Sequence, residues 1–191
     1  MPTMTKLASY KVSSSGLTYI QFDSIPSSYF DLQIRGFVKS TSSGDSNGYS
    51  ALRTYLRADT TDANYSRMYY ETYAVGTGTA AGKSASSNGY VPSSYSGNTA
   101  NAFGMYNCYI HNYANSSTYK SYWFDTTQPA SGGTYEMFWD QNAGYYTGST
   151  AAISSIRITI EGNYVVGSQF ELYGIETYSS AGSGTASVTT G

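Results

Sequence analysis

Apolar and polar residues alternate over short stretches of this chain, and clusters of Gly, Ser and Asn separate the stretches. The alternation is cleanest where Ile156, Ile158 and Ile160 enclose Arg157 and Thr159. Because successive side chains of a strand point to opposite faces, this pattern predicts strands with one buried and one exposed face. We expect roughly ten such strands, at residues 7–12, 17–22, 29–39, 51–58, 65–73, 101–111, 118–125, 134–139, 151–160 and 168–175.

Regularly spaced short strands with turn residues between them are typical of an all-β fold. We therefore predict an antiparallel β-sandwich, jelly-roll-like, that forms a single domain over residues 1–175. Residues 176–191 are rich in Ser, Gly and Thr, and we interpret them as a C-terminal extension. Residues 76–99 are long for a loop. We expect them to be a functional excursion or a segment that a neighbour orders.

The composition narrows the class of protein. Aromatic residues make up 16% of the chain, which excludes a disordered chain. Charged residues make up only 12% and the net charge is −2, so we expect no nucleic-acid partner. No apolar run is long enough for a membrane helix, and the first residues show no signal-peptide pattern. One cysteine excludes an intrachain disulfide framework.

The single histidine, His111, follows Cys108 at a spacing that occurs in zinc sites. On a strand these two side chains point to opposite faces, and two ligands do not complete a zinc site. No G-x-S-x-G segment presents a serine nucleophile to His111. We therefore expect a core cysteine and a histidine at the rim of the fold.

Glu136 and Asp140 form the closest pair of acidic residues with aromatic neighbours, since Phe138 lies between them and Trp139 is adjacent. Two carboxylates on one face of a strand are the minimum for a glycosidase, and the rings resemble a platform for a sugar. The alternative is a strand whose charges face solvent. We favour the solvent-facing strand, and we predict that the protein is not an enzyme.

The turn-like segment Asp59–Asn64 offers several oxygen atoms to calcium. It lacks the length of an EF-hand loop and its terminal bidentate glutamate. The same residue types form ordinary turns, which is the interpretation we favour. We predict no catalytic residues, no cofactor and no bound metal.

Aromatic clusters are the remaining candidate for function. Adjacent residues of a strand point to opposite faces, so we expect each Tyr-Tyr pair to divide between core and surface. Exposed Tyr among Ser, Gly and Asn is typical of adaptable binding surfaces and also of contacts in assemblies. The candidate interaction residues are Trp123, Trp139, Tyr145 and Tyr146.

Four segments carry the most distinctive sequence of the chain, namely LASYKVSSSGLTYIQFDSIPSSYFDLQIRG (7–36), NYSRMYYE (64–71), NAFGMYNCYIHNYANSSTYKSYW (101–123) and AAISSIRITIEGNYVVGSQFELYGI (151–175). Together these segments resemble a family of tailed-bacteriophage virion proteins. The most specific element is the last one, which ends in Leu-Tyr-Gly-Ile. In the first segment the matching residues are Ile20, Phe22, Ile25, Pro26, Tyr29, Asp31, Leu32 and Ile34.

The resemblance implies a virion structural protein with a β-sandwich fold and no catalytic residues. We expect a capsid decoration (cement) protein that forms a homotrimer on the outer head surface and contacts the major capsid protein or other virion proteins. The alternative is a receptor-binding module of a tail fibre or baseplate that recognises glycans of the host surface. In either case the protein is expected in the virion, after assembly in the bacterial cytoplasm and without a membrane partner.

Overall fold

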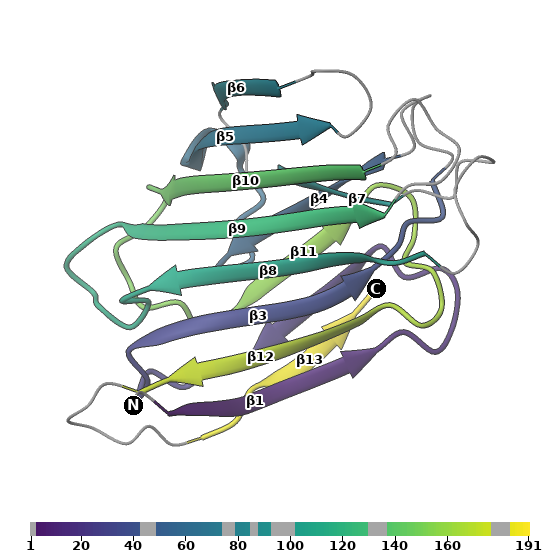
Figure 1. Ribbon diagram of the computed structural model, residues 1–191. Coiled ribbons are helices and arrows are strands. Elements are labelled where there is room, and N and C mark those ends of the chain that lie inside the picture. Colours follow the sequence, from purple (N-terminus) through teal and green to yellow (C-terminus); the bar gives the residue numbers. More distant parts are fainter. Residues whose placement is uncertain are drawn as a thin grey trace.

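The computed structural model describes residues 3–42, 49–73, 79–84, 88–92, 102–129, 137–176 and 184–191. These residues form two antiparallel sheets packed face to face, which confirms the predicted all-β sandwich (Figure 1). The only helix among them is one short 3-10 turn, so no described helix could cross a membrane.

Thirteen strands build the two sheets. They are β1 (Met4–Lys11), β2 (Tyr19–Asp23), β3 (Asp31–Val38), β4 (Tyr49–Leu56), β5 (Tyr65–Tyr73), β6 (Thr79–Ser84), β7 (Asn88–Pro92), β8 (Gly104–His111), β9 (Lys120–Pro129), β10 (Met137–Tyr146), β11 (Ile156–Ile160), β12 (Gln169–Ile175) and β13 (Ser187–Thr190). The 3-10 turn η1 (Asp62–Asn64) precedes β5.

Eight of the strands have the order of a jelly roll. One sheet begins β1-β12-β3-β8, and the other contains β2-β11-β4-β7. The first sheet then continues through β9, β10, β5 and β6, which we call the added strands. In Figure 1 this eight-stranded sheet lies in front, with β1 at the bottom and the added strands at the top.

The C-terminal extension ends as a strand of the sandwich. Residues 187–190 form β13 and pair with β2 in the five-stranded sheet. The carbonyl of Gly191 accepts hydrogen bonds from the backbone N–H groups of Thr18 and Tyr19, at 2.7 and 3.0 Å. The alternation of the sequence also missed β6 and β7, which lie within residues 76–99. β6 and β13 consist mainly of small and polar residues, so they lack the apolar period that marks a strand.

The core of the jelly roll is apolar. Its fully buried side chains include Ile20, Phe22, Ile34, Ile158 and Phe170. Burial of one such side chain stabilises a fold by about 1.5–3 kcal/mol. The sandwich therefore has a sizeable hydrophobic core that needs no disulfide.

Cys108 and His111 lie as the sequence predicted. Cys108 is fully buried, and burial raises the pKa of its thiol to about 12. His111 is exposed at the end of β8, on the opposite face of the sheet. The two residues therefore do not share a site.

Candidate interaction face

The outer face of the added strands carries large apolar side chains. Met68 and Tyr70 of β5 are 67% and 44% exposed, and Tyr145 of β10 is 58% exposed. Trp123 of β9 and Trp139 of β10 are half-buried on the same face, since they alternate with the inward residues of their strands.

Part of the inner face of the same strands is polar. Asp140 of β10 is fully buried, and its Oδ1 accepts a hydrogen bond of 2.7 Å from the side-chain amide of Asn142. The guanidinium of Arg67 donates to Asn142 Oδ1 at 2.6 Å and lies 4.0 Å from Asp140 Oδ2. Glu71, also buried, pairs with Asp140 across the strands. Burial raises the pKa of Asp140 to about 7 against the attraction of Arg67, and the charge of Glu71 raises it further.

The prediction that Asp140 faces solvent is therefore wrong. Asp140 occupies an inward position of β10, where Arg67 and Asn142 compensate its burial. Its expected partner Glu136 lies outside the described residues. The rule that charges face water predicted the wrong face for Asp140, because β5 and β10 bury Arg67, Glu71 and Asp140.

Strands β1, β12 and β3 have the ordinary polarity on their outer face. Lys6 and Glu171 form an ion pair of 3.2 Å, and Tyr173 donates a hydrogen bond to the same carboxylate. The guanidinium of Arg35 lies 5.3 Å from the centre of the Tyr173 ring. Here a polar network faces water, although Phe37 of β3 is also exposed.

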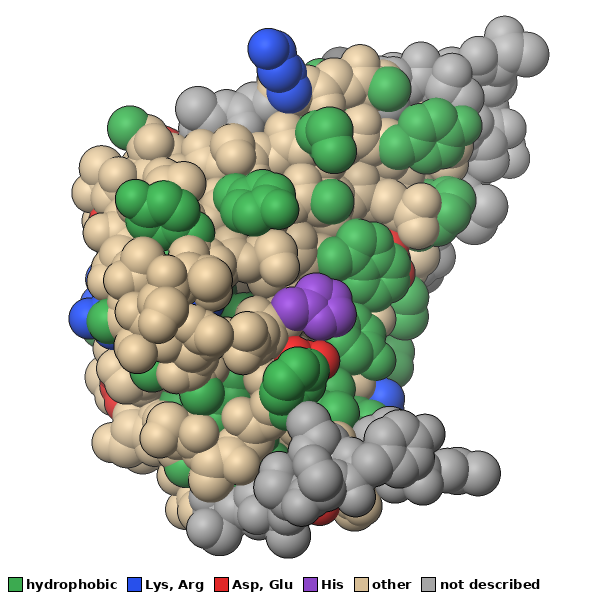
Figure 2. Space-filling model, turned by 90° about the vertical axis from the view of Figure 1, so that its left-hand side faces the viewer, with side chains coloured by type: hydrophobic (Ala, Val, Ile, Leu, Met, Phe, Trp, Pro, Cys, Tyr) green, Lys and Arg blue, Asp and Glu red, His purple; other side chains and the backbone are tan. Residues whose placement is uncertain are grey.

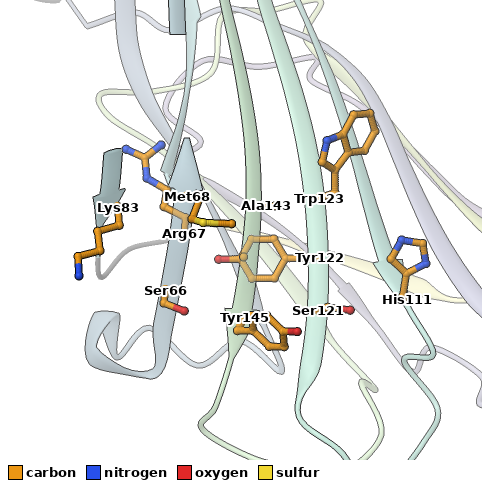
Figure 3. Close-up of a pocket in the computed structure, with 11 residues that line it drawn as sticks. Ser66, Arg67, Met68, Lys83, His111, Ser121, Tyr122, Trp123, Ala143 and Tyr145 are labelled. Carbon is orange, nitrogen blue, oxygen red and sulfur yellow. The ribbon is translucent and has the colours of Figure 1, made fainter. Parts of the chain in front are cut away.

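A hollow of about 780 Å³ opens on the outer face of the added strands (Figure 3). Small side chains form its floor, namely Ser66, Ser121 and Ala143. Large side chains stand around this floor, from five different strands: Met68, Lys83, His111, Trp123 and Tyr145. Large and small residues alternate along the paired rows Met68–Ala143–Trp123 and Ser66–Tyr145–Ser121.

A close packing of rings fixes the sheet beneath the hollow. The inner side of Gly144 lies against the ring of Tyr122, and a Cβ at this position would come within 2.4 Å of it. Only glycine therefore allows Tyr122 to pass under β10. Tyr122 in turn stacks on Phe124, with ring centres 6.1 Å apart.

His111 closes one end of the hollow. Its Nδ1 lies 3.4 Å from the carboxylate of Asp31, which also accepts the backbone N–H of Asn112 at 2.7 Å. Its ring stacks on Tyr109, and Tyr109 packs beside Trp123 with ring centres 5.8 Å apart. Figure 2 views this end of the sandwich and shows hydrophobic side chains gathered beside the single histidine.

A buried lysine holds the loop next to this end. The ammonium of Lys120 donates hydrogen bonds to the carbonyls of Asn115, Thr118 and Thr150. Burial lowers the pKa of Lys120, and the three carbonyls compensate the buried charge. This arrangement fixes the start of β9 and hence the position of Ser121.

Three of the four predicted interaction residues share the outer face. Trp123 and Tyr145 line the hollow, and Trp139 lies farther along β10, outside it. Tyr146 is only 2% exposed, and its hydroxyl donates to Asp59 at 3.0 Å. The prediction of Tyr146 as a surface residue is wrong. Tyr146 lies inward next to the outward Tyr145, as expected for adjacent residues of a strand.

The sequence interpretation missed Met68, Tyr70 and Lys83 as residues of this face. The signal was present in β5, where Met68 and Tyr70 alternate with Arg67 and Glu71. The alternation shows that these two pairs lie on opposite faces. It does not tell which face is covered.

The acidic turn at Asp59 uses its oxygens within the fold. The Asp59 carboxylate accepts hydrogen bonds from the Thr61 backbone, the Asn64 amide and the Tyr146 hydroxyl. These bonds lower its pKa against the opposing effect of burial. Among the described residues, no group of three His, Cys, Asp or Glu side chains could hold a metal ion.

Comparison with known proteins identifies no family for this chain. No family model matches the chain, and the curated proteins contain no significant match to it.

Proposed function

We propose that the protein is a virion structural protein of a tailed phage, of the decoration type, and that the outer face of its added strands docks onto another virion protein. The observation that carries this proposal is the inverted polarity of β5 and β10. Their charged residues Arg67 and Asp140 are buried, whereas Met68 and Tyr145 face outward. A partner that covers the apolar outer face of such a strand pair stabilises it by removing that surface from water.

The composition of the face fits a protein interface. Interfaces are enriched in Tyr, Trp, Phe and Met and depleted of Lys, Glu and Asp. Besides Met68, Tyr70 and Tyr145, the outer face of the eight-stranded sheet exposes Phe37 and Met105, which pair across β3 and β8. Covering apolar surface stabilises a complex by about 25 cal/mol per Å² before the costs of association.

A decoration protein acts through many copies. We propose a homotrimer that contacts the major capsid protein, so that symmetry repeats the same modest contact over the shell. Simultaneous contacts of linked copies raise the overall affinity far above that of one contact. The proposed role is therefore binding and bracing, and it needs no catalytic residue.

Binding to undecorated, expanded heads of the phage tests the proposal. The wild-type protein should bind heads saturably at a fixed copy number, and it should not bind host cells. Tyr70→Asp should weaken head binding at least tenfold, because it places a charge in the docked face. Tyr119→Asp is the matched control, since Tyr119 is 54% exposed on the loop between β8 and β9.

Two outcomes would contradict the proposal. Equal binding of heads by the Tyr70→Asp and Tyr119→Asp variants would show that the face does not dock. Binding to host cells and not to heads would instead favour a receptor-binding module of a tail fibre or baseplate. The half-buried ring of Trp123 and the exposed ring of Tyr145 favour this second candidate, because sugar rings stack on aromatic side chains.

A further inference from the structure

The hollow continues along β10 as a groove. A second, smaller hollow of about 260 Å³ lies beside the first and shares Met68, Trp123 and Ala143 with it. The two hollows meet above Ala143, the small residue of that row. The groove therefore runs from Tyr145 to Gln141, a distance of about 13 Å at the rise of a strand. This shape suits an extended chain better than a compact ligand.

The main hollow is apolar and has one exposed cation, Lys83, at its end. Lys83 is exposed on β6 at one end, and His111 lies at the other. Among the described residues, Lys83 forms no ion pair, and the lining includes no Asp or Glu. Charge complementarity therefore favours an anionic occupant.

The chemistry of the lining also distinguishes a peptide from a sugar. A sugar presents many hydroxyl groups, and a site that holds it must supply hydrogen-bonding partners for them. The described lining of the main hollow contains no Asn, Gln, Asp or Glu, and its hydroxyls are those of Ser66, Ser121, Tyr122 and Tyr145. An apolar side chain needs no hydrogen-bonding partners and is stabilised by contact with the apolar side chains of Met68 and Trp123.

We propose that this groove binds an extended, acidic segment of the partner protein. One apolar side chain of the segment lies over Ala143, between Met68 and Trp123, and a carboxylate of the segment pairs with Lys83. Central apolar anchors in pockets carry most of the energy of protein interfaces. This inference rests on the proposed function and names what the docked face recognises.

Filling the groove and reversing its charge test the inference on heads. Ala143→Trp fills the space over β10 at an exposed position, and Lys83→Glu opposes an acidic segment. Each variant should lower the affinity for heads at least tenfold. Lys11→Glu is the matched control for charge, because Lys11 is exposed on β1, at the other edge of the same sheet. It should bind as the wild type does.

Overlapping synthetic peptides that cover the major capsid protein identify the segment. The peptides that bind should combine carboxylates with an apolar residue, and their affinity should fall as salt screens the pair with Lys83. In a Trp139→Phe background Trp123 is the sole tryptophan, so its fluorescence should change on binding. Ala143→Trp should abolish peptide binding, which is measured for this variant without the fluorescence readout.

The outcomes separate this inference from the proposed function. If Tyr70→Asp abolishes head binding and Ala143→Trp and Lys83→Glu do not, the face docks but the groove is not the recognition site. If the wild type does not bind heads, the proposed function itself fails. If no peptide binds, whereas a glycan binds the wild type and not Ala143→Trp, the occupant of the groove is a glycan and the inference is wrong.

Discussion

On β3 the inward residue Ile34 is fully buried and the outward residue Arg35 faces water, whereas on β5 the inward residue Arg67 is buried and the outward residue Met68 is exposed. Both strands belong to one continuous sheet. At these positions the jelly-roll half has an apolar inside and a polar outside. On β5 and β10 the added half reverses this, with Arg67 and Asp140 inside.

Under the proposed function the two halves have different tasks. The jelly-roll half is stabilised by its own core, which both sheets share. The added half keeps apolar surface on its outer face beside buried charges on its inner face. The proposed function has a partner cover this outer surface.

Arg67→Met should lower the free energy of unfolding by about 3–5 kcal/mol, because removal of one partner leaves the buried carboxylate of Asp140 without its cation. Chemical denaturation measured by circular dichroism checks this value. The double variant Arg67→Met/Asp140→Leu removes both charges and should recover most of the loss. A double variant that is no more stable than Arg67→Met would show that the two residues do not act as a pair.

Asp140→Asn should remove one pH dependence of stability. The pKa of Asp140 is raised to about 7 in the folded protein, from the ordinary value of 3.8. The folded state therefore holds a proton that the unfolded state releases, and stability falls as pH rises from about 4 to 7, by up to about 1.4 kcal/mol per pH unit.

Denaturation of the wild type and Asp140→Asn at a series of pH values measures this effect as a difference. Asp59 and Glu171, whose pKa values are lowered, lose stability in acid and contribute equally to both proteins. Their effects cancel in the difference. Parallel curves from pH 4 to 7 would contradict a raised pKa of Asp140.

Tyr146→Phe should lower the free energy of unfolding by about 1 kcal/mol, because it removes one hydrogen bond to Asp59 and keeps the buried ring. Tyr145→Phe is the matched control on the neighbouring, exposed position and should change stability little. Thermal denaturation of both variants gives the comparison. Equal effects of the two substitutions would contradict the opposite orientations of these residues.

Met68→Ser should change the free energy of unfolding by no more than about 0.5 kcal/mol, since an exposed residue contributes little to folding. The same variant should bind heads at least tenfold more weakly. Ile34→Ser, on the inner face of the jelly-roll half, should instead unfold the protein at much lower denaturant. A large loss of stability in Met68→Ser would show that its side chain serves the fold rather than a partner.

The alternation of the sequence predicted the sandwich and most of its strands, because each strand of the jelly-roll half buries one apolar face. It also predicted the separation of Cys108 from His111 and of Tyr145 from Tyr146. These are local consequences of the strand period of two. They hold whatever the strand pairs with.

The polarity of the added half could not be predicted in this way. A strand that alternates Arg67 with Met68 has two distinct faces, but only its place in the sheet decides which one is buried. Asp140 was assigned to solvent for this reason. β13 escaped prediction because its pairing with β2 joins residues at opposite ends of the chain. The hollow depends on Ala143 lying between Met68 and Trp123, which are neighbours only through the pairing of three strands.

Oxidation of methionine side chains, followed by mass spectrometry, tests the central claim most directly. Exposed methionines oxidise readily to sulfoxides. Met68 lies on the added half and is 67% exposed, and Met4 lies on β1 of the jelly-roll half and is 37% exposed. In the free protein both should oxidise. On protein bound to heads, Met68 should be protected and Met4 should oxidise as before, whereas protection of Met4 alone, or of neither residue, would contradict docking through the added strands.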